Sequence, residues 1–353
     1  MKKLMKGNEA MAEAAVMAGC RYYFGYPITP QSEVPEYLSW RMAEVGGVYK
    51  QAESELAAAN MLFGAGAAGG RAMTSSSGLG IALMQEAISH TCACEIPAVY
   101  LNVSRGGPAL GCIQPGQADY YQMTRGGGPG DYSMIVYAPS NVQEACDLLQ
   151  LAFDKAEQYR NPVAVYADGC IGQIMESVEI HERERDPKLP PKSWAATGWD
   201  DPSRRPTGFT SVFMDPAKCE RHNDHLQEKY RIIRENEARL DTIDTDDADV
   251  VLVAYGTTAR ICMSAKRIAA ESGIRVGIAR PITIWPFPAR QLYRACQNAK
   301  AVLCVEMAAG QLYDDVRLAL NGSRDAGLYY RLGGMMPRAR DICQEITKLL
   351  EEA

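Results

Sequence analysis

Hydrophobic and polar positions in the first half of the chain follow two alternating patterns. Short runs rich in β-branched and aromatic residues predict buried strands, and apolar residues repeated every three to four positions predict helices between them. The predicted strands cover about residues 21–24, 47–51, 71–74, 97–103, 134–138 and 162–167. The predicted helices cover about residues 7–19, 31–43, 56–66, 81–90 and 141–158, the last with Asn141 as its N-cap. Strands that alternate with helices form a mostly parallel, doubly wound sheet.

The same alternation returns in the second half, after a stretch of different composition. Residues 178–247 are rich in charge and proline and end in a polar helix near residues 226–240. Beyond them the pattern predicts strands at about 250–254, 275–279, 301–306 and 327–331 and helices at about 258–272, 288–297, 310–321 and 337–351. The predicted fold class is therefore α/β. It has two doubly wound α/β domains, at residues 1–177 and 248–353, joined by a charged connector at residues 178–247.

Length and charge narrow the classes of function. A chain of 353 residues with 47% apolar residues is globular and large enough for two domains. The formal net charge of −6 argues against a nucleic-acid partner, because phosphate binding needs a concentration of Lys and Arg. No apolar run approaches the ~20 residues that span a bilayer. Asn8 and Glu9 interrupt the basic start before a signal-type apolar segment can form, so we expect a cytoplasmic protein without membrane contact.

The eleven cysteines are scattered, and only Cys92 and Cys94 stand close together. Because no C-x-x-C spacing occurs, neither a zinc ribbon nor a ferredoxin-type cluster can be built in the usual way. We expect these cysteines to behave as small buried apolar residues.

A loop with two prolines, Gly-Tyr-Pro-Ile-Thr-Pro at 25–30, connects the first predicted strand to the next helix. Pro27 and Pro30 fix their own φ angles and keep the residues before them out of the α region. The loop should be stiff and present the Ile28 carbonyl and the Thr29 hydroxyl at a fixed place. The carboxyl edge of a parallel sheet is where ligands bind, although an ordinary connection made rigid by proline has the same local pattern.

Glu55 stands at the start of the helix predicted at 56–66. A carboxylate at that position can simply cap the helix or complement its dipole. The functional alternative is a carboxylate in an apolar pocket lined by Ala and Gly, where it can exchange a proton with a heterocyclic nitrogen. Glu53, two residues earlier, would point elsewhere, so we do not expect the two carboxylates to act as a pair.

Arg105 directly follows the apolar strand at 97–103 and precedes Gly106-Gly107-Pro108. An arginine at the carboxyl end of a strand is well placed to bind a carboxylate with both arms of its guanidinium. The alternative is a surface arginine that pairs with Asp119 or Asp131. Residues 104–131 are glycine-rich and long enough to be a functional loop without regular structure.

Three further groups of residues carry weaker patterns. The glycine run at 126–130 could cradle a phosphate but lacks the Lys-Ser/Thr of a P-loop. Cys219, His222 and His225 are an incomplete ligand set, and a solvated helix explains their spacing better. Neither the serines at 75–77 nor His90 offers a recognisable pair of nucleophile and base.

Four motifs together resemble the α subunit of 2-oxoacid:ferredoxin oxidoreductases. They are Tyr-Pro-Ile-Thr-Pro at 26–30, Gln-Ala-Glu-Ser-Glu at 51–55, Thr-Ser-Ser-Ser-Gly at 74–78 and Asn-Val-Ser-Arg-Gly-Gly-Pro at 102–108. The resemblance covers nearly the whole chain and is closest to the branched-chain (3-methyl-2-oxobutanoate) type, with the 2-oxoglutarate type almost as near. It implies that the first domain is the pyrimidine-binding domain of a thiamine diphosphate enzyme. It also implies that the second domain is similar to the C-terminal domain of transketolase.

The resemblance also implies roles for individual residues. Glu55 matches the catalytic glutamate that hydrogen-bonds N1′ of the aminopyrimidine, and Pro27 and Ile28 belong to the loop beside that cofactor. Thr29 and Arg105 match residues that contact the 2-oxoacid and its carboxylate. The implied reaction is oxidative decarboxylation of a 2-oxoacid to acyl-CoA and CO₂, with coenzyme A as co-substrate and ferredoxin as electron acceptor. The cofactor carries the difficult chemistry, and the protein supplies placement and electrostatics.

Two features that this reaction needs are missing from the chain. The magnesium motif that holds the diphosphate is represented only by Asp168-Gly169, and no asparagine follows before Asn223. Cluster cysteines are also missing. The resemblance therefore implies that this chain provides no metal ligands and is inactive alone. Mg²⁺ and the iron–sulfur clusters would belong to partners: a β subunit with the diphosphate site, a γ subunit and a ferredoxin-like δ subunit.

Several alternatives remain open from the sequence. No Arg or Lys besides Arg105 lies in residues 104–117, which favours a branched-chain substrate over the dicarboxylic 2-oxoglutarate. A lipoamide-dependent dehydrogenase or a transketolase-like chain would use the same domain types. A non-catalytic protein that binds a metabolite or nucleotide is the alternative from another class, because fold does not settle function.

Overall fold

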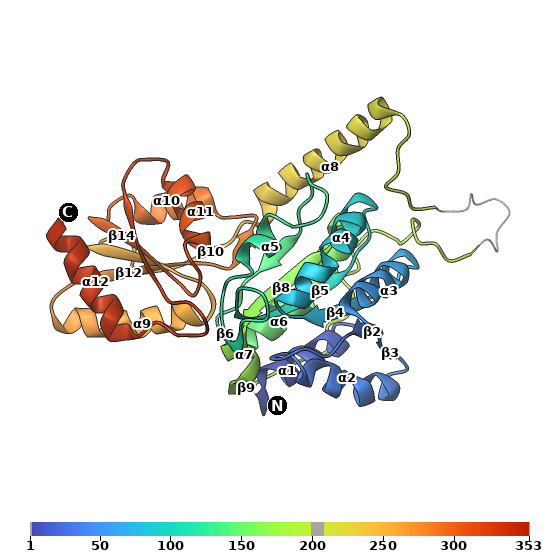
Figure 1. The fold of residues 1–353 in the computed structure, drawn as a ribbon, viewed down its shortest axis with the longest axis horizontal. Helices are drawn as coiled ribbons and strands as arrows, with labels where there is room; N and C mark the ends of the chain where they lie inside the picture. The colour runs from blue at the N-terminus through green and yellow to red at the C-terminus, as the bar shows by residue number, and fades with distance from the viewer. Residues whose placement is uncertain (1, 199–207, 353) are drawn as a thin grey trace.

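The computed structural model describes residues 2–198 and 208–352, which form two α/β units built on separate sheets. The larger sheet has the strand order β13-β7-β8-β5-β4-β2-β3, with β6 added beside β5 (Figure 1). Along this order every pair is parallel except β13 with β7. The strands are β2 (Tyr22–Gly25), β3 (Val48–Gln51), β4 (Ala72–Ser76), β5 (Val99–Gly106), β6 (Cys112–Pro115), β7 (Ile135–Tyr137), β8 (Val163–Asp168) and β13 (Thr283–Trp285).

The smaller sheet belongs to the C-terminal part of the chain, which lies to one side of the larger unit in Figure 1. Its strand order is β10-β12-β11-β14-β15, and only β10 runs antiparallel to its neighbour. The strands are β10 (Leu240–Ile243), β11 (Val250–Val253), β12 (Val276–Pro281), β14 (Ala301–Glu306) and β15 (Ala326–Tyr330). A separate antiparallel pair joins β1 (Lys3–Lys6) to β9 (Met175–Val178).

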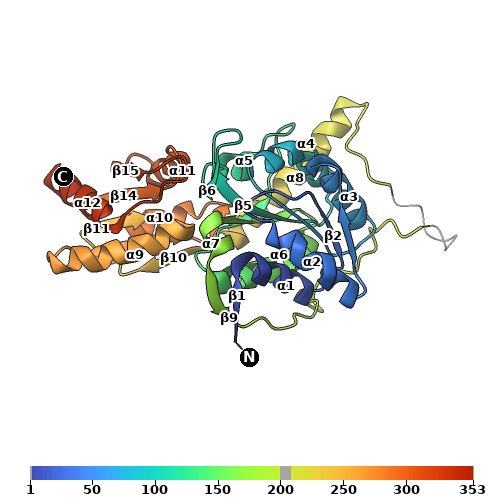
Figure 2. The same cartoon turned by 60° about the horizontal axis from the view of Figure 1, so that its bottom comes forward.

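Helices cover both faces of the larger sheet. In Figure 2, α1, α2 and α6 gather on one side, and α3 and α4 pack together on the other. Side-chain caps begin several helices: Asn141 Oδ1 accepts from the Glu144 amide at 2.8 Å, and Ser54 caps α3. The helices are α1 (Gly7–Met17), α2 (Glu33–Glu44), α3 (Glu55–Ala67), α4 (Leu79–Ala93), α5 (Tyr120–Thr124), α6 (Val142–Tyr159), α7 (Gly169–Gln173), α8 (Pro216–Glu237), α9 (Gly256–Glu271), α10 (Ala289–Cys296), α11 (Gln311–Leu320) and α12 (Ala339–Glu352). None of these described helices is long and apolar enough to cross a bilayer.

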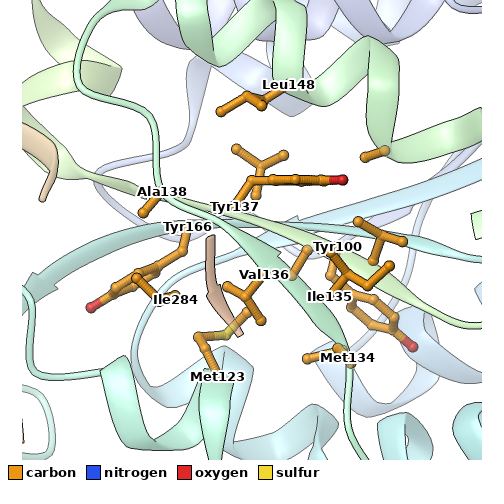
Figure 3. Close-up of a cluster of buried hydrophobic side chains, with 14 of the residues drawn as sticks. Tyr100, Met123, Met134, Ile135, Val136, Tyr137, Ala138, Leu148, Tyr166 and Ile284 are labelled. Carbon is orange, nitrogen blue, oxygen red and sulfur yellow. The ribbon is translucent and has the colours of Figure 1, made fainter. Parts of the chain in front are cut away.

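The main hydrophobic core runs through the larger sheet. Figure 3 shows Leu148 of α6 on one face and Met123 of α5 on the other, with Ile135 and Val136 of β7 between them. All four side chains are buried, and burying a side chain of this size stabilises the fold by about 1.5–3 kcal/mol. The central strands are buried on both faces, which explains their continuous apolar runs.

Several elements differ from the sequence predictions. β5 continues to Gly106, so Arg105 lies inside the strand instead of following it. The stretch at 104–131, predicted to lack regular structure, contains β6 and α5. α8 begins about ten residues earlier than predicted, where Asp215 accepts from the Ala217 amide.

A set of buried hydrogen bonds joins the two sheets, and we call its three residues the junction: Gln117, Asp168 and Thr257. Asp168, at the end of β8, accepts from the Thr257 amide at 2.8 Å and from the Thr257 hydroxyl at 2.6 Å. Gln117 exchanges hydrogen bonds with the backbone of Met307, and its side-chain amide donates to the Tyr255 carbonyl. The two units are therefore fixed to each other by polar groups as well as by apolar packing.

The described part of the predicted connector runs along the larger unit. Arg183 and Arg185 bind Asp154 and Glu157 of α6, the same carboxylates that Arg71 binds from the other side. Residues 199–207 of the predicted connector lie outside the described residues. Further on, α8 packs against the end of α4, where Lys229 reaches the Glu95 carboxylate at 3.3 Å.

Candidate functional site

The carboxyl ends of three adjacent parallel strands bring distant segments together. In the order β5-β4-β2, these ends carry Arg105, the serines at 76–77 and the proline loop at 26–30. Glu55 begins the helix that follows β3 at the same edge. Parallel strands place their carboxyl ends on one side of the sheet, so segments far apart in the sequence meet there. We call Thr29, Glu55, Ser76, Ser77 and Arg105 the site edge.

Arg105 connects β5 to the proline loop. Its Nη1 donates to the Thr29 carbonyl at 2.9 Å, and the residue is 9% exposed. Its Nε is buried and has no hydrogen-bond partner among the described residues. The alternative of a surface arginine does not hold, since Arg105 is buried, and among the described residues no ion pair joins its guanidinium to Asp119 or Asp131, although its charge acts on the nearby Asp119 carboxyl. The guanidinium therefore keeps donors for another acceptor.

Asp119 is instead occupied by neutral donors. Its Oδ2 accepts from the Gly78 amide and from the Asn102 side chain, each at 3.1 Å. Burial raises the pKa of the Asp119 carboxyl above its ordinary value, although these hydrogen bonds oppose the shift. Asp119 thus holds the turn between β4 and α4 in place beside Arg105.

The proline loop is fixed mainly through Gln31, which follows it. The Ser75 hydroxyl donates to Gln31 Oε1 at 2.5 Å and is also hydrogen-bonded to the Tyr23 hydroxyl at 2.7 Å. The Ile28 carbonyl, which we expected the loop to present, accepts from the Gln31 amide at 3.1 Å. Thr29 and Pro27 are exposed, whereas Ile28 is half-buried. The loop therefore leaves Thr29 exposed, while hydrogen bonds to Gln31 fix the backbone next to it.

Glu55 is 5% exposed, although it stands on the first turn of a helix. Ser54 caps that helix, because its hydroxyl accepts from the Ala57 amide at 3.2 Å. The Glu55 carboxylate has no hydrogen bond or ion pair within the part of the chain that the structure describes. A Cβ added at Gly80 would come within 2.6 Å of Glu55 Oε1, so a glycine is needed where α4 passes this carboxylate. Glu53 is exposed and lies before the helix begins.

Buried polar atoms without partners gather around these residues. Within the described ranges, they include the hydroxyls of Ser76 and Ser77, Asn102 Oδ1 and Arg105 Nε. Buried polar groups in proteins are nearly always hydrogen-bonded, so a local group of exceptions indicates a place for ordered water or a polar ligand. Ser76 and Ser77 were not predicted as site residues. The run of three serines before Gly78 was a usable pattern, but no nearby base drew attention to it.

The site edge suits half of thiamine diphosphate. A buried carboxylate without a partner matches the requirement of a pyrimidine nitrogen for a hydrogen-bond partner. No comparable site for the diphosphate and its metal is seen among residues 2–198 and 208–352, where no group of three or more His, Cys, Asp or Glu could hold a metal ion. Asp168, whose sequence context resembles part of the magnesium motif, already has hydrogen-bond donors at the junction. Besides Thr257, the backbone amides of Cys170 and Ile171 donate to its carboxylate. Burial raises the pKa of Asp168, and the bonds from Thr257 oppose this.

The remaining candidate motifs have structural partners. The amides of Gly127 and Gly128 both donate to the Tyr132 hydroxyl at 3.1 Å, so they are not arranged to cradle a phosphate. The helix of Cys219, His222 and His225 is less solvated than predicted, since His222 contacts the Ala93 carbonyl and His225 contacts Glu95. All eleven cysteines fall within the described ranges and are free.

A cavity of about 540 Å³ opens beside Thr29. Its walls come from the proline loop, β6, α7 and the segment before α12. Apolar surface comes from Ile113, Pro115, Ile174 and Met336. Among the described residues that line the cavity, Glu33 is the one with a charged side chain. Although burial opposes ionisation, hydrogen bonds from Lys6 and Asn8 hold the pKa of Glu33 below its ordinary value. The compartment is therefore largely apolar, and the one carboxylate in its described lining is paired with Lys6 at 2.7 Å.

The sequence matches two profiles of one enzyme family. The profile described as pyruvate flavodoxin/ferredoxin oxidoreductase, thiamine diphosphate-binding, matches residues 13–237. The profile described as pyruvate:ferredoxin oxidoreductase core domain II matches residues 248–342.

Curated relatives match along almost their whole length. Ketoisovalerate oxidoreductase subunit VorB of Methanothermobacter marburgensis is 44% identical over 351 residues, which cover 99% of each chain. The 2-oxoglutarate synthase subunit KorA of Methanothermobacter thermautotrophicus is 34% identical over 370 residues, covering 98% of each chain. Both relatives are named as subunits of larger enzymes.

Solved structures share the fold. A 2-oxoglutarate:ferredoxin oxidoreductase from Magnetococcus marinus, with 2-oxoglutarate, coenzyme A and succinyl-CoA bound, aligns with a TM-score of 0.87 at 24% identity. The alignment covers 99% of this chain and 65% of that longer chain. A split-gene transketolase aligns with a TM-score of 0.61 at 14% identity. The likenesses show the fold, and together with the two profile matches they confirm the predicted fold class, a thiamine-diphosphate pyrimidine-binding-type unit followed by a transketolase C-terminal-like unit.

Proposed function

Because the chain belongs to the 2-oxoacid:ferredoxin oxidoreductase family, we propose that it is the α subunit of such an enzyme. The reaction is CoA-dependent oxidative decarboxylation of 3-methyl-2-oxobutanoate (ketoisovalerate) to the acyl-CoA and CO₂, with electrons passed to ferredoxin. The observation that carries this proposal is the pair of unsatisfied groups at one sheet edge, the Glu55 carboxylate and the Arg105 guanidinium.

Glu55 is the residue for the cofactor. Bound thiamine diphosphate supplies the electron sink that decarboxylation of a 2-oxoacid requires. The Glu55 carboxylate is buried and unpaired among the described residues, so it is free to hydrogen-bond N1′ of the pyrimidine and to hold a proton there. Pro27 and Ile28 form the stiff wall beside that ring. Gly80 leaves room around the carboxylate.

Arg105 and Thr29 are the residues for the substrate. The unpaired Nε of Arg105 and its remaining guanidinium donors can bind a carboxylate with two parallel hydrogen bonds. Thr29, whose carbonyl Arg105 already holds, adds an exposed hydroxyl at the same place. This arrangement orients a 2-oxoacid by its carboxylate.

The cavity beside Thr29 supports the branched-chain substrate. Its apolar walls suit an isopropyl group, and Glu33, which is already paired with Lys6, offers nothing that attracts a second carboxylate. The 2-oxoglutarate type is the second candidate, and the KorA likeness favours it. A dicarboxylic substrate would need a cation to pair with its distal carboxylate, and the described lining of the cavity offers none.

We further infer that partner subunits complete the enzyme. Because Asp168 is occupied at the junction, the Mg²⁺ and diphosphate site belongs to a β subunit, and the iron–sulfur clusters belong to a ferredoxin-like δ subunit beside a γ subunit. In this proposal residues 1–177 form the pyrimidine-binding domain and residues 248–353 form the transketolase-like domain. Residues 178–247 connect the two. The chain alone is inactive.

The test is dye reduction by the co-expressed subunits. With coenzyme A and thiamine diphosphate present, we expect 3-methyl-2-oxobutanoate to give the highest kcat/KM, ahead of pyruvate and 2-oxoglutarate. A preference for 2-oxoglutarate would transfer the assignment to the second candidate. Viologen reduction by the rigorously isolated chain would contradict the division of the active site between subunits.

A further inference from the structure

A second, larger cavity lies away from the site edge, where the two sheet units meet. It has a volume of about 810 Å³ and is bordered by the C-terminal half of α8, the segment after β13, the start of α10 and the residue that follows α5. In Figure 1 the labelled helices among these elements, α5, α8 and α10, lie near the boundary between the two units. None of the five residues of the site edge belongs to its lining.

The lining of this cavity is strongly cationic. Five arginines face it, and Glu235 is the one carboxylate in its described lining. The arginines are Arg125, Arg231, Arg234, Arg290 and Arg294. In a chain with a formal net charge of −6, this is a marked local concentration of positive charge. We call these five residues the arginine groove.

Most of this charge is not neutralised by the protein. Arg231 pairs with Glu228 and Glu235, and Arg125 pairs with Asp315 at 2.6 Å. The other three arginines form no ion pair within the described ranges. Among these, Arg234 lies over the Trp285 ring at 5.6 Å, and Arg290 and Arg294 are exposed one helical turn apart on α10. Like charges at that spacing destabilise a helix slightly unless an anion lies between them.

The cavity also has apolar surface. Pro286 and Phe287 lie beside the indole of Trp285, and Phe287 is half-buried. Arginine binds phosphate with two parallel hydrogen bonds and is weakly hydrated, so it is well suited to a phosphorylated ligand. A concave site of this size that combines polar and apolar lining residues is of the kind that binds small molecules.

We propose that the arginine groove binds a small molecule with two or more phosphate groups and an attached ring, of the nucleoside diphosphate class. The phosphates lie between Arg234, Arg290 and Arg294, and the ring lies against Pro286 and Phe287. This inference does not depend on the proposed function. An acidic segment of a protein partner would use the same charges, but it has no ring to place against Pro286 and Phe287.

The test is titration calorimetry of the full-length chain at about 0.05 M and 0.15 M salt, with ADP, inorganic tripolyphosphate, adenosine and a hexaglutamate peptide as probes. We expect ADP and tripolyphosphate to bind more weakly as salt rises, because screening weakens exposed charge interactions. Adenosine alone should not bind detectably. ADP should bind more tightly than tripolyphosphate if its ring contacts the apolar surface.

A double variant, Arg290→Gln with Arg294→Gln, should weaken ADP binding about tenfold or more, which corresponds to about 1.4 kcal/mol. The matched control is Arg267→Gln with Arg340→Gln, two exposed arginines outside the groove, and it should bind ADP like the unaltered chain. Equal weakening in both double variants would overturn the site, as would no binding of ADP. Tighter binding of hexaglutamate than of tripolyphosphate would overturn the small-molecule assignment in favour of an acidic protein partner. Loss of ADP binding when the chain is assembled with its partner subunits would also overturn the small-molecule assignment.

Discussion

Along the carboxyl edge of the larger sheet, buried polar groups differ in whether the fold provides them with hydrogen-bond partners. At the end of β8, the Asp168 carboxylate accepts four hydrogen bonds, two from Thr257 and two from the first amides of α7. At the ends of β4 and β5, by contrast, Ser76, Ser77 and Arg105 keep buried atoms without partners among the described residues. The Glu55 carboxylate is unpaired as well.

The difference separates a structural carboxylate from a site. A buried polar group that the fold satisfies contributes to stability, whereas one that the fold leaves unsatisfied costs free energy that a ligand can recover. Asp168 therefore belongs to the first class, although its sequence context resembles a metal motif. Glu55 belongs to the second, although its sequence context is that of an ordinary helix start.

The largest expected effect is that of Glu55→Gln on catalysis. Removing a positioned acid–base group typically lowers the rate by about 10²–10⁴-fold, so kcat of the assembled complex with 3-methyl-2-oxobutanoate should fall by that factor. Because the carboxylate has no partner to lose in the described chain, the melting temperature should not decrease. Glu53→Gln is the matched control and should retain activity. Undiminished turnover by Glu55→Gln would remove the catalytic assignment.

Asp168→Asn should give the opposite pattern. The substitution weakens charge-assisted hydrogen bonds from Thr257 and from α7, so the free energy of unfolding should fall by about 2–4 kcal/mol. Chemical denaturation of the chain measures this loss. Asp147→Asn, at an exposed carboxylate of α6, is the control and should change stability by less than about 0.5 kcal/mol. If Asp168→Asn kept full stability, the contrast between the two strand ends would not hold.

Arg105→Lys tests whether the guanidinium acts by its geometry. Lysine keeps the charge but cannot bind a carboxylate with two parallel hydrogen bonds. We therefore expect kcat/KM for the 2-oxoacid to fall by about 10–100-fold, mainly through a higher KM. Steady-state dye reduction at varied substrate concentration separates the two parameters. A fall in kcat with unchanged KM would contradict a role in substrate binding.

Stability should also depend on pH through Glu306. Burial raises its pKa to about 7, although the amides of Leu312 and Tyr313 donate to it and oppose the shift. A carboxyl with a raised pKa in the folded state stabilises the fold at low pH. That contribution is full below the ordinary value of 4.5 and is lost as pH rises from 4.5 to about 7. The slope is at most about 1.4 kcal/mol per pH unit.

Comparison with Glu306→Gln isolates this contribution, because the amide oxygen can still accept from the helix but does not titrate. As pH rises from 4.5 to about 7, the unaltered protein should lose unfolding free energy relative to the Glu306→Gln variant. A constant difference would mean that Glu306 does not titrate there. It would then resemble Asp168 as a fully satisfied group at a strand end.

Much of the local structure follows from local sequence. Asn141 and Ser54 cap their helices because their side chains accept from amides three residues along, and such contacts depend only on neighbouring residues. The alternation of apolar strands and amphipathic helices predicted the two α/β units. The prolines at 27 and 30 predicted a stiff loop, and the four motifs predicted the family.

Short and irregular elements could not be predicted in this way. β13 has only three residues, and it joins the larger sheet because its position beside β7 allows antiparallel pairing. β6 and α5 lie in a glycine-rich stretch without a clear apolar period, and their contacts with β5 and α11 stabilise them. Segments of three to five residues are too short to show a helical or strand period in the sequence.

The sequence by itself determined which residues could do chemistry, because residue type and local spacing set their donors, acceptors and charges. Only the tertiary structure decided which of them are free to do it. Thr257 satisfies Asp168 from 89 positions away, and Tyr132 occupies the amides of Gly127 and Gly128. Glu55 and Arg105 stay available because no described side chain forms an ion pair with either, and Arg105 Nε has no hydrogen-bond partner there. Hydrogen-bond satisfaction depends on which distant residues the fold brings within about 3 Å, and local sequence does not contain that information.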